Sequence, residues 1–97
     1  MRNDSEKKVE DYLCDQVKAQ GGLCIKLNPF WYVGIPDRLV LLPGGRIGFC
    51  ETKRPSGGRR GAKQDWWNFA VRSLGFTCMY VRTEAQVDVF LRFIAMP

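Results

Sequence analysis

Histidine is absent from this 97-residue chain. Its absence excludes Ser–His and Cys–His nucleophilic sites, histidine general bases and histidine-ligated zinc. Any metal ion would have to be held mainly by carboxylate and carbonyl oxygens. These are the ligands preferred by Mg²⁺ and Mn²⁺, so the sequence favours a hard divalent cation if it favours a metal at all.

Paired-cysteine and nucleotide-binding motifs are also lacking. None of the four cysteines belongs to a C-x-x-C pair, which argues against a zinc knuckle or a thiol redox motif; they are Cys14, Cys24, Cys50 and Cys78. We expect free thiols that act as small apolar residues. No G-x-G-x-x-G or P-loop pattern occurs, so a nucleotide cofactor is not indicated.

Long hydrophobic runs are missing as well. No apolar stretch approaches the roughly 18 residues that a bilayer-spanning helix needs. Residues 1–5 open a charged segment and contain no hydrophobic signal region. We therefore expect a cytoplasmic protein without a membrane partner.

Basic residues outnumber acidic ones, 15 to 10, which gives a net charge of +5 and a pI near 9.3. Basic domains often bind nucleic acid, because neutralising phosphates releases counterions. A soluble protein that is merely basic is the alternative. The length predicts one domain, residues 1–97.

Hydrophobic periodicity and turn residues predict an α/β fold, a mixed sheet flanked by helices. Ser5 is a suitable N-cap for the first helix, Gly21 and Gly22 end it, and residues 83–86 form a capping box for the last. The expected elements are a helix at 5–20, strands at 23–27, 38–42 and 46–53, a helix at 62–74, a strand at 76–82, and a final helix with Val87, Phe90, Leu91 and Ile94 as its buried face.

The strand at 46–53 ends in a charged pair. Side chains alternate along a strand, so Glu51 and Lys53 share a face, continuing the one begun by Ile47 and Phe49. Asp37 begins the partner strand of the hairpin that turns at residues 43–45, and it falls roughly opposite Glu51. Two carboxylates brought together repel each other, and a divalent cation relieves that repulsion.

Phosphodiester hydrolysis needs such a site. A metal ion on Asp37 and Glu51 polarises a phosphoryl oxygen and lowers the pKa of its bound water. Lys53 would orient that water and offset charge on the phosphate, and the Thr52 carbonyl is a candidate further ligand. The alternative is a surface salt bridge between Glu51 and Lys53, with Asp37 capping a turn.

Several motifs together resemble the PD-(D/E)xK nuclease superfamily, and within it the VRR-NUC (virus-type replication-repair nuclease) family. They are Gly34-Ile35-Pro36-Asp37, the 14-residue step to Glu51-Thr52-Lys53, the Leu-Pro-Gly-Gly-Arg hairpin, Lys53-Arg54-Pro55, an early helix glutamate and Gln64 at the start of a helix. The resemblance runs from about residue 5 to residue 91.

This resemblance implies a Mg²⁺- or Mn²⁺-dependent nuclease with a restriction-endonuclease-like core. The family's metal-binding aspartate falls on Asp37, its E-x-K pair on Glu51 and Lys53, and its helix glutamine on Gln64. The first-helix glutamate, a further metal ligand, falls best on Glu10. Glu6 is the competing choice, although the helix dipole alone favours a first-turn glutamate. A solvated helix face is the alternative for Glu10.

The helix that carries Gln64 departs from the family pattern. A Ser or Thr usually caps this helix before the glutamine. Here the preceding residues, 60–63, are Arg-Gly-Ala-Lys, so the cap is weaker.

Cations cluster after the catalytic strand in a basic, glycine-rich loop at 56–61 that we expect to be mobile. Their expected role is to hold phosphates without reading sequence, and a solvated loop is the alternative. The candidate DNA-binding residues are Arg54, Arg59, Arg60 and Lys63, extended by Lys26 and Arg38.

Aromatic residues gather at two places. Phe30, Trp31 and Tyr32 stand in a loop, where they either stack on an exposed base or serve as core or interface residues. Trp66 and Phe69 lie beside the expected apolar stripe of the second helix, where they either support a homodimer or widen the core contact. That stripe consists of Trp67, Ala70, Val71 and Leu74.

Stand-alone members of the family resemble Holliday junction resolvases that act as homodimers. We therefore expect a structure-selective DNA endonuclease of bacterial or phage origin, acting on branched DNA in DNA repair. The alternatives are a flap, fork or non-specific nuclease and a non-catalytic nucleic-acid-binding module. RNA as a substrate stays open.

Overall fold

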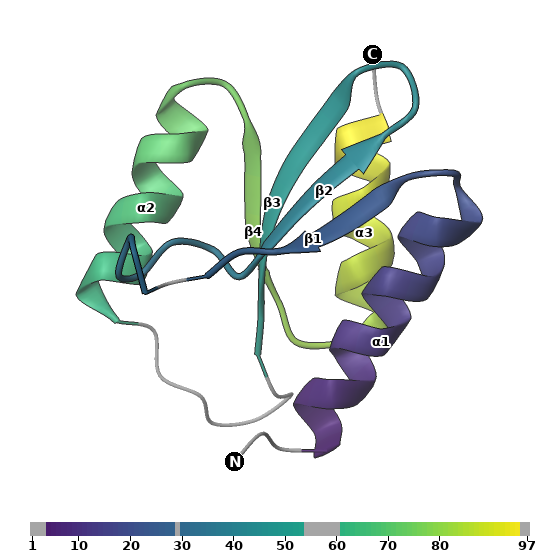
Figure 1. The fold of residues 1–97 in the computed structure, drawn as a ribbon, viewed down its shortest axis with the longest axis horizontal. Helices are drawn as coiled ribbons and strands as arrows, with labels where there is room; N and C mark the ends of the chain where they lie inside the picture. The colour runs from purple at the N-terminus through teal and green to yellow at the C-terminus, as the bar shows by residue number, and fades with distance from the viewer. Residues whose placement is uncertain (1–3, 29, 54–60, 96–97) are drawn as a thin grey trace.

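A computed structural model describes residues 4–28, 30–53 and 61–95. Its elements are α1 (Asp4–Ala19), β1 (Leu23–Lys26), β2 (Arg38–Leu42), β3 (Arg46–Thr52), α2 (Ala62–Ser73), β4 (Thr77–Val81) and α3 (Glu84–Ala95) (Figure 1). The expected α/β fold is confirmed, and all seven elements lie where the sequence predicted them. For the six elements whose two ends were predicted, those ends agree to within one residue. Most of the predicted basic loop, residues 56–60, lies outside the described residues.

The four strands form one mixed sheet in the order β1-β2-β3-β4. The first three strands are antiparallel neighbours, whereas β3 and β4 are parallel. Because parallel strands need a crossover connection, α2 sits between β3 and β4 in the chain. Helices α1 and α3 cover one face of the sheet, and α2 packs on the other face against β4 (Figure 1).

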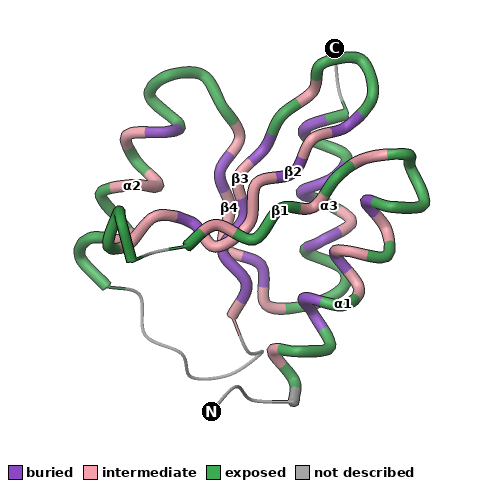
Figure 2. The backbone as a smooth tube through the Cα atoms, viewed as in Figure 1, coloured by how far each residue is buried: buried purple, intermediate pink, exposed green. Residues whose placement is uncertain are grey.

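The hydrophobic core lies between the sheet and the helix pair α1 and α3 (Figure 2). The predicted buried face of α3 is confirmed, because Val87, Phe90, Leu91 and Ile94 are all buried. Gly48 on β3 allows α3 to approach closely, since a Cβ atom there would lie 2.5 Å from Ile94 Cγ2.

Turn and cap residues explain where the elements begin and end. Gly44 and Gly45 both have positive φ, 87° and 74°, which fits the predicted hairpin turn. At the start of α3, the Gln86 N–H donates to Thr83 Oγ1 over 3.1 Å. The second half of the capping box differs from expectation, because Gln86 Oε1 accepts from the Arg82 N–H.

The four cysteines are free thiols, as expected, and Cys50 and Cys78 are buried. Among the described residues, no helix combines the length and the apolar character that a membrane span requires.

Candidate active site

Strand pairing brings the two predicted metal-binding acids to the same end of the sheet. Arg38 of β2 pairs with Cys50 of β3. Asp37 precedes Arg38 and Glu51 follows Cys50. The two acids are therefore the next pair in the same antiparallel register. The two carboxylates repel each other, and this repulsion contributes to a raised pKa of Glu51. Strand register thus places Asp37 and Glu51 at the same end of the sheet, and their sharing of one metal ion stays a prediction.

Thr52 fixes the carboxylate of Asp37. Its hydroxyl donates to Asp37 Oδ2 over 2.8 Å, and its backbone N–H donates to Asp37 Oδ1 over 3.2 Å. The same hydroxyl lies 3.3 Å from Glu10 Oε1. Because a hydroxyl has one proton, it donates to one of these acids at a time, and the shorter distance favours Asp37. Thr52 therefore links Asp37, which directly precedes β2, with Glu10 of α1.

The sequence reasoning assigned Thr52 only a backbone carbonyl and missed its hydroxyl. Strand alternation held the signal: Thr52 points to the opposite face from Glu51, toward α1. The side chain is almost fully buried, with 1% exposure, and a buried hydroxyl requires hydrogen-bond partners.

Glu10 is the buried acid of the first helix, with 4% exposure. Its Oε2 lies 3.9 Å from Arg38 Nη2, an ion pair enclosed between α1 and β2. This placement corrects the expectation that Arg38 contacts DNA: its side chain is only 12% exposed. Arg38 shares the face of β2 that α1 covers, so it offsets the charge of Glu10 instead of facing solvent.

Glu6 and Glu10 both act on the acid pair. Glu10 contributes to a raised pKa of Asp37, whereas Glu6, one turn earlier and half-buried, contributes more than Glu10 to the raised pKa of Glu51. The burial of Glu10 and its contact with Thr52 favour it as the helix acid. They also argue against a solvated helix face at this position.

Burial dominates the electrostatics of the site. It raises the pKa of Glu51 from its ordinary value of 4.5 to about 8, repulsion from Asp37 adds to the shift, and attraction by Lys53 opposes it. Burial also raises the pKa of Asp37, while the two hydrogen bonds from Thr52 lower it. Ionising both acids therefore costs free energy that a bound cation would return.

Gln64, which the sequence placed at the start of α2, accepts a hydrogen bond from Lys53. Lys53 Nζ donates to Gln64 Oε1 over 3.1 Å, and the same oxygen accepts the Gly61 N–H over 3.2 Å. The N-cap, Gly61, provides no side-chain cap, as expected from the departure from the family pattern. Gln64 replaces it by satisfying a helix N-terminal donor, and it joins α2 to Lys53, the residue that follows β3.

The donor set fits a hard divalent cation in its chemistry, because it consists of carboxylates with no thiol or imidazole. No three Asp, Glu, Cys or His side chains within 4–28, 30–53 and 61–95 already form a metal-binding group. Asp37 and Glu51 would supply two oxygen donors at one end of the sheet. The Thr52 hydroxyl lies between Asp37 and Glu10.

Comparison with known proteins assigns the family. A solved structure described as a VRR_NUC domain matches with a TM-score of 0.82 and 32% sequence identity, covering 91% of this chain and 95% of that chain. The chain belongs to the VRR-NUC nuclease family. The resemblance found in the sequence is thereby confirmed.

A curated relative supports the same assignment. This VRR-NUC chain is 42% identical over 55 residues to "Putative nuclease p44" of Acyrthosiphon pisum secondary endosymbiont phage 1. The match spans 57% of this chain and 59% of the relative's length. No family model matches the chain.

The predicted DNA-binding cations of this VRR-NUC chain divide into three groups. Lys63 and Lys26 are exposed. Arg38 is enclosed beside Glu10. Arg54, Arg59 and Arg60 lie outside the described residues.

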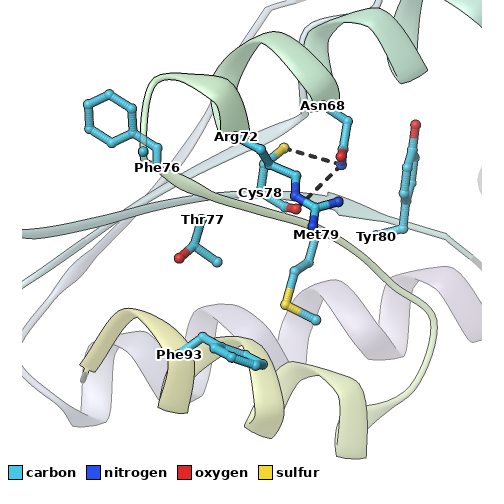
Figure 3. A pocket seen from close by; sticks show the side chains of 9 residues that line it. Asn68, Arg72, Phe76, Thr77, Cys78, Met79, Tyr80 and Phe93 are labelled. Atoms are coloured by element: carbon cyan, nitrogen blue, oxygen red, sulfur yellow. Dashed lines mark hydrogen bonds between the residues drawn. The ribbon is translucent and has the colours of Figure 1, made fainter. Parts of the chain in front are cut away.

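A hollow of about 650 Å³ lies away from the acids, between α2, β4 and α3 (Figure 3). Arg72 and Phe93 line it, and the amide of Asn68 reaches the Cys78 carbonyl and sulfur within it (Figure 3). None of the candidate catalytic residues belongs to this hollow, so it is separate from the site at the strand ends.

Proposed function

We propose that this VRR-NUC chain is a divalent-metal-dependent endonuclease that hydrolyses DNA phosphodiester bonds in branched DNA such as Holliday junctions. The observation that carries the proposal is the meeting of Asp37 and Glu51 at one end of paired strands, with Lys53 two positions along and held by Gln64. Acids alone would repel DNA, so this arrangement favours an enzyme with a metal ion over a binding module.

Asp37, Glu51 and the Thr52 carbonyl would hold Mg²⁺ or Mn²⁺, with Glu10 behind them. When bound, such an ion polarises a phosphoryl oxygen and makes its water more acidic. Thr52 keeps the carboxylate of Asp37 in one orientation through two hydrogen bonds, which would preorganise it as a metal ligand.

Lys53 supplies the positive charge on the substrate side. Its Nζ, kept near α2 by Gln64, offsets negative charge that develops on the phosphate and orients the attacking water. Lys63 and Lys26 add phosphate contacts that provide affinity without reading the base sequence. Arg54, Arg59 and Arg60 extend this role in the proposal.

A homodimer completes the proposal. Phe69 and Leu74, at the outer side and end of α2, are 73% and 77% exposed, so the alternative that Phe69 widens the core contact does not hold. We propose that these two side chains contribute to the surface that a second copy covers. Two active sites related by a two-fold axis would suit the near two-fold symmetry of a four-way junction.

The test is cleavage of a four-way junction, a flap and a linear duplex, each with Mg²⁺, with Mn²⁺ and with EDTA. We expect metal-dependent cutting of branched DNA by the wild type and a loss of at least about 100-fold in Glu51→Gln and Asp37→Asn. Glu84→Gln is the control, because Glu84 is an exposed acid on α3.

Each alternative has its own outcome. Equal cutting of linear duplex would refute structure selectivity, while wild-type protein that leaves every substrate uncut but binds DNA would favour the binding module. The same panel with RNA strands decides the sugar preference. A monomeric mass in solution with and without junction DNA would refute the homodimer.

A further inference from the structure

All three tryptophans of the chain meet at one place. Trp31, Trp66 and Trp67 line a hollow of about 400 Å³ together with Tyr32, Val33 and Lys63. We call this set the aromatic platform. It joins two segments that are far apart in sequence, the loop before β2 and the first turns of α2.

The platform is exposed, which excludes a core role for its outer rings. Trp31 is 76% exposed, and Tyr32 and Trp66 are both 59% exposed. The rings nevertheless hold one another edge to face, with centroids 5.3 Å apart for Trp66 and Trp67 and 5.8 Å apart for Tyr32 and Trp67. In an edge-to-face pair the edge of one ring covers only one face of the other, so the remaining faces are not covered within the pair, and an uncovered ring face is what a stacking partner needs.

Specific contacts fix the loop against α2. Trp67 Nε1 donates to the Val33 carbonyl over 3.1 Å. Gly34 has φ of +88°, and a Cβ atom there would lie 2.6 Å from Lys63 Cβ and 2.9 Å from the Gln64 nitrogen. The loop backbone therefore lies directly on the residue that holds Lys53. This contact connects the platform to Lys53 through Gln64.

The partner is identified by the chemistry of the platform. Open aromatic faces stack on nucleobases of any identity, and a neighbouring lysine suits the phosphates that connect them. Bases inside a duplex are already stacked and paired, so only unpaired bases reach such a surface at low cost. Lys63 and the chain's net charge of +5 complement DNA.

We propose that the aromatic platform binds unpaired bases of branched DNA next to the bond that is cut. This inference rests on the proposed nuclease function, which supplies the DNA substrate. It adds that unpaired bases are the feature by which the protein distinguishes that substrate from linear duplex. A second copy of the chain is the competing occupant, and the test separates the two.

The experiment uses tryptophan fluorescence, because every tryptophan of the chain belongs to the platform. Full-length Glu51→Gln protein in EDTA is titrated with three probes: a duplex with a short thymine gap, the same duplex with abasic linkers in the gap, and a fully paired duplex. We expect quenching and roughly tenfold tighter binding with the thymine gap. Equal quenching and affinity for the thymine and abasic probes would overturn the proposal.

A matched pair of variants keeps the test specific. Trp31→Ala removes an exposed ring from the platform, whereas Phe93→Ala removes one, 55% exposed, from α3. We expect Trp31→Ala to abolish the preference for thymine over abasic gaps and Phe93→Ala to retain it. The same loss of preference in both variants, or in neither, would contradict the proposal.

The outcomes also separate this inference from the nuclease proposal. Base-dependent quenching without cleavage by wild-type protein supports the platform and removes the nuclease proposal. Metal-dependent cleavage without base-dependent binding keeps the nuclease and removes the platform. A blue shift of the tryptophan emission that grows with protein concentration, before DNA is added, would instead assign the surface to a second copy of the chain.

Discussion

Helices α1 and α3 pack along all four strands on one face of the sheet, whereas α2 on the other face contacts mainly β4. The face under α1 and α3 contains the core and encloses Glu10. On the face of α2, Leu23, Ile25 and Ile47 are 62%, 38% and 38% exposed. We refer to these as the covered face and the open face.

The difference separates stability from function. The covered face contributes the buried apolar area of the fold and holds Glu10, Arg38 and Thr52 in fixed positions. The open face bears Lys53 with its partner Gln64, and the exposed aromatic platform adjoins them. Substitutions in the covered face should therefore reduce stability, and substitutions on the open face should change activity or binding in a folded protein.

Phe90→Ala should have the largest effect, since Phe90 has no exposed surface. Removing a buried phenyl ring typically costs about 3–5 kcal/mol of unfolding free energy. Urea unfolding measures it, with Phe93→Ala on the same helix as the control, expected within about 0.5 kcal/mol of wild type. A similar loss of unfolding free energy in both variants would contradict the assignment of Phe90 to the buried side of α3 and of Phe93 to its exposed side.

Thr52→Val should come next, because it keeps the shape of the side chain but removes the donor to Asp37. The loss of a buried hydrogen bond costs about 1–3 kcal/mol, and we expect cleavage to fall on the order of tenfold. Thr52→Ser should retain cleavage, since it keeps the hydroxyl that donates to Asp37. Calorimetric titration with Mn²⁺ gives a second readout, and unchanged affinity in Thr52→Val would argue against a role in orienting Asp37.

Glu51→Gln should alter how stability depends on pH. The folded-state pKa of Glu51 is raised from 4.5 to about 8, so its stabilising contribution is complete below about pH 4.5 and is lost as pH rises through 8. In EDTA, the wild type should lose more thermal stability than the variant between pH 5 and pH 9. We expect a difference of roughly 5 °C in Tm, the equivalent of about 1 kcal/mol. Parallel pH profiles would refute the burial of this charge.

Leu23→Ala on the open face should have the smallest effect, because an exposed side chain contributes little to folding. Its unfolding free energy should stay within about 0.5 kcal/mol of wild type. Leu13→Ala on the covered face, where Leu13 has no exposure, is the matched comparison and should cost about 2–5 kcal/mol. A large loss in Leu23→Ala would mean that something covers the open face in solution.

Much of the fold was predictable because local signals agreed with one another. Glycines at 21–22, 44–45 and 75 ended elements, and the apolar spacing of α3 marked its buried side. Which face of a strand a helix covers is decided by packing between distant segments. The sequence suggested an apolar face from Ile47 and Phe49, yet Gly48, Cys50 and Thr52 face the core and Ile47 is exposed.

Strand register predicted which candidate residues would lie at the same end of the sheet, but not all of their contacts. Asp37 and Glu51 followed from hairpin register, which is set by a short turn. The contact of Thr52 with Glu10 joins residues 42 apart, and the pairing of Arg38 with Glu10 depends on where α1 docks. Such long-range contacts leave no periodic signal in the sequence, so Arg38 was assigned to DNA from its charge alone.

The central claim is that Asp37 and Glu51 share one divalent cation. The most direct measurement is an anomalous difference map from crystals of the protein grown with Mn²⁺. The account predicts a peak within coordination distance of both carboxylates, absent from crystals of Glu51→Gln. A map with no peak there, or with a peak that touches neither acid, would contradict it.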